Sequence, residues 1–466
     1  MTTLRSSTGL LLRSPEELKG LGEAFPRVMG VLCGDEEEDV VSLEFWLALE
    51  AYMVFGIRGR KKTVMQFASF KALREAVAEW QRRRDAPASR VRGLLQSIWS
   101  SAIVAKEENL EKLTLSRATI RGLLASAFFL NTRPQCALDF SSGGDDPLYV
   151  SSGRAAVEKL IGLLQYFSVT SHPEENQEMV SFERFRGATD FEDHKKVGFR
   201  VSESEEEEGI LLVSDWSAGP QRAPAGNRVT QSEALIAAYP ESYLALHVLS
   251  FAALNDDEVF VARNLRPCVH TTGAYHGFRA ETTTIARAPG RTIVFADAPR
   301  TSSPRSRAAV DAALKKARAI NAAVPDDEKD VVLYGGVWGA ASFLDAADVV
   351  LRVIQLAVAL KATVVVRSQD IHDKDKKRLT AISGALAKRN AQSTNLLQLM
   401  VHERNNDNTL EESGAAVPPF GRDLVAWLRK LPRTEREEDT TQQQQHEKKR
   451  PRLSASPTAE EKKEEY

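Results

Sequence analysis

The sequence contains little cysteine. Cys33, Cys136 and Cys268 are the only three in 466 residues, and none has another cysteine two or three positions away. Three cysteines that lie far apart suggest neither a disulfide framework nor a zinc ribbon, which needs closely spaced pairs. The low cysteine content favours a reducing compartment.

Long apolar runs are also lacking at the start of the chain. The run from Leu10 to Leu12 is followed at once by Arg13 and, two residues later, by Pro15. It is too short for the core of a signal peptide or for a membrane span. We therefore expect a soluble protein of the nucleus, the cytoplasm or both, without a membrane partner.

A strong excess of one charge is absent as well. The formal net charge is -2 at pH 7, and 42% of the residues are hydrophobic, which is ordinary for a globular protein. A chain with this balance has no overall electrostatic affinity for nucleic acid, so we expect no direct sequence-specific nucleic-acid binding. Its length is sufficient for a large core without disulfides, and we expect a monomer.

The residue patterns divide the chain into three zones. Residues 1–147 are expected to form an N-terminal helical accessory region, because apolar residues recur at helical spacing in "SLEFWLALEAYMVF" and "LTLSRATIRGLLASAFFL". The second of these helices is expected to begin at a cap formed by Ser116 or Thr114. Residues 148–432 form the main domain, and residues 433–466 form a charged tail with too few apolar residues to fold.

Short β-branched runs alternate with helical patterns in the main domain. This alternation predicts an α/β fold, with a mixed sheet flanked by helices on both faces. The expected strands lie at 209–216, 257–262, 291–298, 330–336 and 362–368. The expected helices lie at 231–251, 305–323 and 345–360.

Two charged stretches lie outside these elements. In the tail, a compact basic cluster is formed around Pro451 by Lys448, Lys449, Arg450 and Arg452. It has the form of a nuclear import signal, and a solvated charge cluster is an equally open interpretation. The acidic run at 204–208 is expected to be a solvated loop or hairpin.

Two loops of the main domain have residue types that suit a ligand. One leads from the strand ending near Ser214 to the helix at Gln231, and the other leads from Tyr334 to the helix near Asp345. Glycines and small residues let backbone amides approach a bound group, and ligands of α/β sheets bind beyond the carboxyl ends of the strands. We therefore expect the functional site at these loops.

Several motifs occur in a fixed order along residues 113–390. They are "LTLSRATIRGLLASAFF", "LIGLLQYFSVTS", "QSEALIAAYPESYLALHVLSF", "HTTGAYHGF", "TIVFADA" and "GGVWGAASFLDAADVVLRVIQLAVAL". Their order and spacing resemble the poly(ADP-ribose) glycohydrolase family. The resemblance implies a macrodomain-like α/β core fused to an N-terminal helical accessory region.

The family signature is a triple glycine, a short spacer and Gln-Glu-Glu, whose second glutamate is the catalytic acid. Here Gln231 is kept, Ser232 stands in place of the first glutamate, and Glu233 stands at the position of the catalytic acid. The triple glycine is missing from positions 221–223, although Gly226 remains nearby. The resemblance thus implies that Glu233 is the general acid/base. It also implies that Gln231, Ser232 and Gly226 contact the substrate.

Three more substrate contacts are expected in the other loops. Tyr275 resembles the family's tyrosine that stacks on adenine, and Phe343 resembles the aromatic residue that packs on the ribose and diphosphate. Gly339 would let the backbone come close to the same ligand.

Each of these residue patterns also has a purely structural interpretation. Without the resemblance, Gln-Ser-Glu at a helix start is typical of capping, in which side chains satisfy free backbone amides. His270 and His276 match no zinc motif, and the acidic residues of "QDIHDKDKK" are typical of a solvated first helical turn. We therefore expect no metal site.

Two functions remain open from the sequence. The first is hydrolysis of the ribose-ribose O-glycosidic bonds of poly(ADP-ribose), which releases ADP-ribose and requires no cofactor. Its partners would be poly(ADP-ribose) or ADP-ribosylated proteins. The alternative is a catalytically impaired pseudoenzyme that binds ADP-ribose or acts as an interaction module, because the glycine loop has changed.

Overall fold

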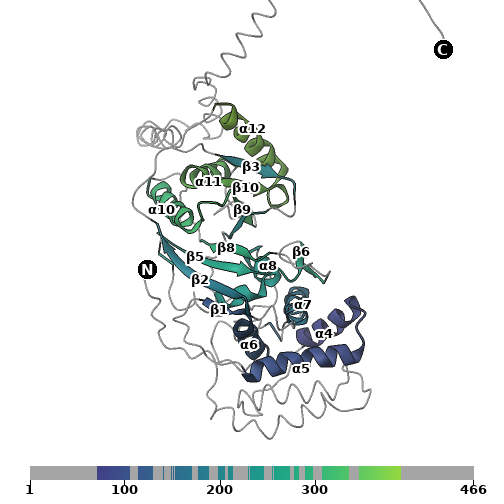
Figure 1. Cartoon of the computed structure of the whole chain (residues 1–466). Coiled ribbons are helices and arrows are strands. Elements are labelled where there is room, and N and C mark those ends of the chain that lie inside the picture. Colours follow the sequence, from purple (N-terminus) through teal and green to yellow (C-terminus); the bar gives the residue numbers. More distant parts are fainter. Residues whose placement is uncertain are drawn as a thin grey trace, which may run out of the picture.

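The structure is a computed structural model in which part of the chain is described in detail (Figure 1). The described residues are 71–104, 114–129, 140, 148–149, 151, 153–170, 177–187, 198–204, 208–213, 229, 231–245, 254–255, 257–272, 278–282, 289–296, 307–334 and 346–389.

An eight-stranded mixed sheet forms the centre of the fold, in the order β1-β2-β5-β8-β4-β9-β10-β3. Strands β8, β4, β9, β10 and β3 are parallel to one another, and β5, β2 and β1 continue the sheet through antiparallel pairing. The strands are β1 (Thr114–Ser116), β2 (Met179–Arg186), β3 (Phe199–Ser202), β4 (Ile210–Val213), β5 (Glu258–Leu265), β8 (Arg291–Phe295), β9 (Asp330–Tyr334) and β10 (Thr363–Arg367). A separate antiparallel ribbon joins β6 (His270–Thr272) to β7 (Arg279–Glu281).

The five strands expected from β-branched runs are confirmed as β4, β5, β8, β9 and β10. Strands β1, β2, β3, β6 and β7 were not predicted. Most of these are only three or four residues long. In β2 the buried positions are limited to Val180 and Phe182, so the strand lacks the continuous apolar run of the central strands.

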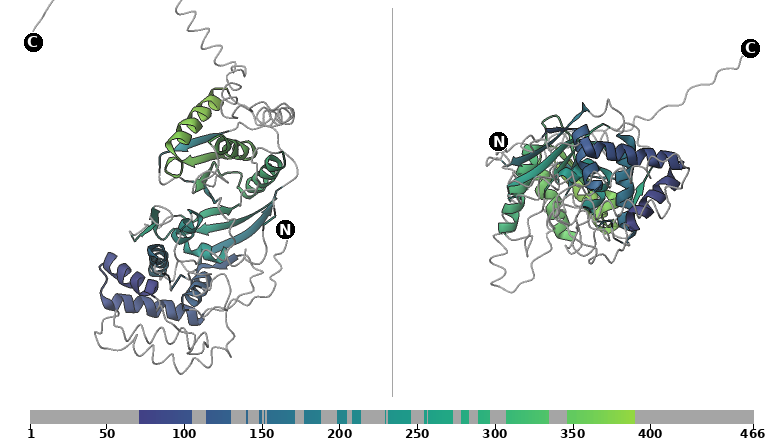
Figure 2. Two further views of the ribbon diagram at one scale, coloured as in Figure 1. Left: turned by 180° about the vertical axis from the view of Figure 1, so that it is seen from behind. Right: turned by 90° about the horizontal axis from the view of Figure 1, so that it is seen from below.

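The helices cover both faces of the sheet. They are α4 (Lys71–Arg83), α5 (Ala88–Val104), α6 (Arg117–Phe128), α7 (Arg154–Val169), α8 (Gln231–Ala238), α10 (Arg307–Ala323), α11 (Ala346–Ala359) and α12 (Asp373–Arg389). The upright views in Figures 1 and 2 place α10 to α12 toward the top, beside β3 and β10, and α4 to α7 toward the bottom. The predicted mixed α/β fold is therefore confirmed.

Two hydrophobic cores lie on opposite faces of this sheet. In β4, Leu211 and Val213 belong to the core that contains buried residues of α4 to α8, whereas Ile210 and Leu212 belong to the core that contains those of α10 to α12. Successive side chains of a strand point to opposite faces, so a strand that is buried on both sides must be apolar throughout. This explains why the central strands were visible in the sequence.

Helix α6 begins at one of the two caps that the sequence offered. Ser116 is the N-cap residue, and its side-chain oxygen accepts a hydrogen bond from the backbone amide of Thr119. Thr114 lies instead at the start of β1 and pairs with Ser181 of β2. The predicted cap at Ser116 is thus confirmed.

The prediction of one continuous helix over 231–251 is wrong. α8 ends at Ala238, and a 3-10 turn, η5 (Pro240–Ser242), follows before helical residues resume at Tyr243. Proline has no backbone N–H, and its ring clashes with the preceding helical turn, so the pattern of apolar residues could not continue as one helix. The helices expected at 305–323 and 345–360 are confirmed as α10 and α11.

Some predictions fall outside the described residues. These are the helix at 42–55, the charged tail at 433–466 and its basic cluster. The boundaries at 147 and 432 remain predictions. Among the residues that the structure describes, no helix is both long enough and apolar enough to cross a membrane.

Candidate functional site

The two loops expected to form the site leave the sheet at neighbouring positions. β4 and β9 are paired in parallel, and Val213 at the end of β4 lies opposite Tyr334 at the end of β9. Both strands therefore deliver their loops to the same edge of the sheet, which is where α/β folds bind ligands. Strand β8 ends beside them, because the amide of Ala296 donates a hydrogen bond to the carbonyl oxygen of Val213.

Glu233 lies in the first turn of α8, the helix that follows β4. Its side chain is 13% exposed, so the carboxylate is largely enclosed but still reaches solvent. The free amides of a first helical turn favour a negative charge at this place. A carboxylate that is partly enclosed and still reaches solvent can exchange a proton with a bound group.

Lys159 of α7 forms an ion pair with Glu233. Its Nζ lies 3.6 Å from Oε2 of the glutamate, and the lysine side chain is fully buried. A buried ammonium group is costly unless an anion compensates it, and the ion pair with Glu233 supplies this compensation. This ion pair was not predicted from the sequence. The signal that could have indicated it is the charged pair Glu158 and Lys159, which interrupts an otherwise apolar stretch of α7.

Tyr243 is a second group near the candidate acid. Its side chain is fully buried, and its hydroxyl has no hydrogen-bond partner among the described residues. Burial raises the pKa of Tyr243, and the negative charge of Glu233 adds to this shift. The phenol therefore stays neutral, and its hydroxyl can donate a hydrogen bond.

A polar cluster at the ends of β9 and β10 was also not predicted from the sequence. The hydroxyl oxygens of Tyr334 and Thr271 lie 3.2 Å apart, which connects β9 to the β6–β7 ribbon. The guanidinium of Arg367, at the end of β10, lies 4.9 Å from the centre of the Tyr334 ring, and its Nε lies 3.6 Å from Asp370. Burial raises the pKa of Tyr334, although Thr271 and Arg367 oppose this shift.

The structure describes the site residues expected from the sequence only in part. The backbones of Gln231 and Ser232 belong to the first turn of α8 beside Glu233. Their side chains, together with Gly226, Tyr275, Gly339 and Phe343, lie outside the described residues. Their contacts with substrate therefore remain predictions.

Metal ligands are not gathered in the described part of the chain. No group of three or more His, Cys, Asp or Glu residues within it could hold a metal ion. Asp373 and Asp375 lie in the first turn of α12, as expected for the "QDIHDKDKK" segment. Acidic side chains are favourable in the first turn of a helix, where backbone amides are free.

The fold and the site together define an α/β protein with a helical region packed on one face of its sheet and a largely enclosed carboxylate in the first turn of the helix that follows β4. Residues 92–184 match the family model described as "Poly (ADP-ribose) glycohydrolase (PARG), helical domain". This match confirms the family resemblance over a segment that contains α6 and α7. A search of curated proteins gave no match for the chain.

Proposed function

We propose that this protein hydrolyses the ribose-ribose O-glycosidic bonds of poly(ADP-ribose) and releases ADP-ribose, with Glu233 as general acid/base. The family match supports a glycohydrolase-like role in general terms. The observation that carries the finer proposal is that Glu233 is largely enclosed in the first turn of α8, the helix that follows β4, and that β4 ends at the same edge of the sheet as β9.

The chemistry needs one carboxyl group that acts twice. Glu233 first donates its proton to the oxygen of the leaving ribose while the bond from that oxygen to C1″ breaks and positive charge develops on the other ribose ring. The resulting carboxylate then takes a proton from the water that attacks C1″. The carboxyl group is restored, and the net reaction adds one water molecule across the bond.

Several parts of the proposal rest on the sequence and on the family resemblance. The α/β core would be macrodomain-like, and the substrate would be free poly(ADP-ribose) or the polymer on modified proteins. The protein would act as a monomer in the nucleus or the cytoplasm. The diphosphate would be held by the loops that contain Gly226 and Gly339.

A second function is favoured by the loop before α8. The family's triple glycine is missing from positions 221–223, and Ser232 stands in place of the first glutamate of the signature. These changes support a catalytically impaired protein that binds ADP-ribose or acts as an interaction module.

Calorimetric titration with ADP-ribose, combined with a gel assay of poly(ADP-ribose) shortening, separates the two functions. Binding together with shortening supports the glycohydrolase, and binding alone supports the pseudoenzyme. In the active case, Glu233→Gln is expected to abolish shortening, whereas Glu183→Gln on β2, where the carboxylate is exposed, leaves it unchanged. Wild-type turnover in Glu233→Gln would exclude this residue as the acid.

A further inference from the structure

Helix α7 contains two neighbouring charged residues that are both buried. The side chains of Glu158 and Lys159 are fully buried, within a helix whose residues from Ala155 to Phe167 are all buried and mostly apolar. Consecutive residues of an α-helix point about 100° apart, so the two side chains reach different neighbours. Helix α7 therefore forms ion pairs on two of its sides.

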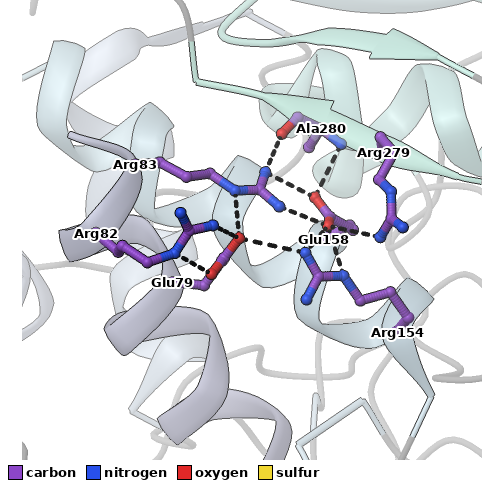
Figure 3. A network of polar contacts seen from close by, with 7 residues as sticks. All are labelled: Glu79, Arg82, Arg83, Arg154, Glu158, Arg279 and Ala280. Atoms are coloured by element: carbon purple, nitrogen blue, oxygen red, sulfur yellow. Dashed lines mark hydrogen bonds and ion pairs between the residues drawn. The ribbon is translucent and has the colours of Figure 1, made fainter.

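The side of α7 that contains Glu158 faces α4 of the N-terminal helical region and the β6–β7 ribbon, as Figure 3 shows. Arg83, the last residue of α4, donates two hydrogen bonds to its carboxylate at 2.7 and 3.0 Å. The backbone of Ala280 in β7 joins the contact, because its amide donates to Glu158 and its carbonyl oxygen accepts from Arg83. Arg154 and Arg279 also form ion pairs with the Glu158 carboxylate. Although burial opposes ionisation, these hydrogen bonds hold the pKa of Glu158 below its ordinary value.

The other side of α7 faces α8. Lys159 pairs with Glu233, and one turn further along a Cβ atom added at Gly162 would lie only 2.9 Å from the carbonyl oxygen of Ala237. Residues three or four apart share a helix face, so these two contacts belong to one interface. The close backbone approach at Gly162 fixes the distance over which Lys159 reaches Glu233.

We propose that α7 positions the candidate acid. Lys159 is a positioning residue that orients the Glu233 carboxylate, and Arg83 holds α7 in place through Glu158. This inference rests on the proposed function. It assigns a role to α4, which precedes the segment at residues 92–184 that matches the family model.

The first test compares two substitutions at Lys159 in the full-length protein. Lys159→Met is expected to lower kcat for polymer shortening on the order of tenfold to a hundredfold with little change in KM, because a misplaced catalytic group slows the chemical step. Lys159→Arg keeps the charge and is expected to recover part of the loss. Wild-type kcat in Lys159→Met would overturn the proposal.

The second test uses two adjacent arginines of α4 as a matched pair. Arg83 binds both Glu79 and Glu158, whereas Arg82 binds Glu79 and is 71% exposed. Arg83→Met is therefore expected to lower kcat, with Arg82→Met near the wild-type value. Equal kcat values for the two variants would contradict a role for the Glu158 anchor.

A readout that needs no activity separates this inference from the proposed function. A wild-type protein that does not shorten the polymer would refute the proposed function only. In that case, melting temperatures of Lys159→Met, Glu233→Gln and the double variant test the pair. The melting temperature of the double variant is expected to fall by less than the sum of the two single decreases, because each single change leaves one charge facing a neutral group. Additive losses would show that the two residues are not coupled, and the inference would fail.

Discussion

Nε of Arg117 donates a hydrogen bond to Oε1 of Glu241 at 2.5 Å, and both side chains are fully buried. Arg117 begins α6 and lies in the segment that matches the family model, whereas Glu241 lies in η5, directly after the helix of the candidate acid. Burial opposes the charged guanidinium, but the carboxylates of Glu241 and Glu178 hold the pKa of Arg117 above its ordinary value. The pair thus attaches the helical region to the segment behind Glu233.

Replacing Arg117 by methionine is expected to destabilise the protein by about 3 to 5 kcal/mol, because the Glu241 carboxylate stays buried after its cation is removed. Urea unfolding followed by circular dichroism measures this loss. Arg117→Met combined with Glu241→Leu is the control, and it should recover part of the stability because neither charge remains. A single variant as stable as the wild type would contradict the expectation.

Gly162→Ala is expected to lower the stability by about 1 to 3 kcal/mol. The added Cβ would lie 2.9 Å from the carbonyl oxygen of Ala237, and backbone cannot move away as a flexible side chain can. Gly93→Ala in α5 is the matched control, since nothing lies within 4 Å of its added Cβ. Thermal unfolding should show the control stabilised, by up to about 1 kcal/mol, as alanine favours a helix interior. Stabilisation of both variants would refute the close helix contact.

The carboxylate of Glu79 predicts a loss of stability in acid. Hydrogen bonds from Arg82, and then from Arg83, lower its pKa from 4.5 to about 2 against the effect of burial. A carboxylate whose pKa is lower in the folded state stabilises the protein above pH 4.5, and this contribution disappears as the pH falls toward about 2. We expect it to amount to about 1 to 2 kcal/mol, since the group is near the surface.

Thermal unfolding across this pH window, for the wild type and for Glu79→Gln, measures the contribution. The difference in stability between the two proteins should shrink as the pH falls, because the wild-type carboxylate becomes protonated and then resembles the neutral glutamine. A constant difference over the window would show that Glu79 is not linked to folding in this way.

Local patterns made most of the α/β core predictable. Strands buried on both faces must be apolar throughout, so the sequence revealed β4, β5, β8, β9 and β10. The strands that it did not reveal, such as β1 and β3, are short and lie at the edges of the sheet, where pairing partners rather than residue type define them. The break at Pro240 could have been predicted from the missing amide of proline.

The sequence by itself determined the alternation of strands and helices, the cap at Ser116 and the identity of Glu233 as the candidate acid, because these depend on residues that are close in the chain. Only the tertiary structure decided what surrounds that acid. Lys159 precedes Glu233 by more than seventy positions, yet their charged atoms lie 3.6 Å apart. No local pattern fixes such a distance, because it depends on how α7 packs against α8.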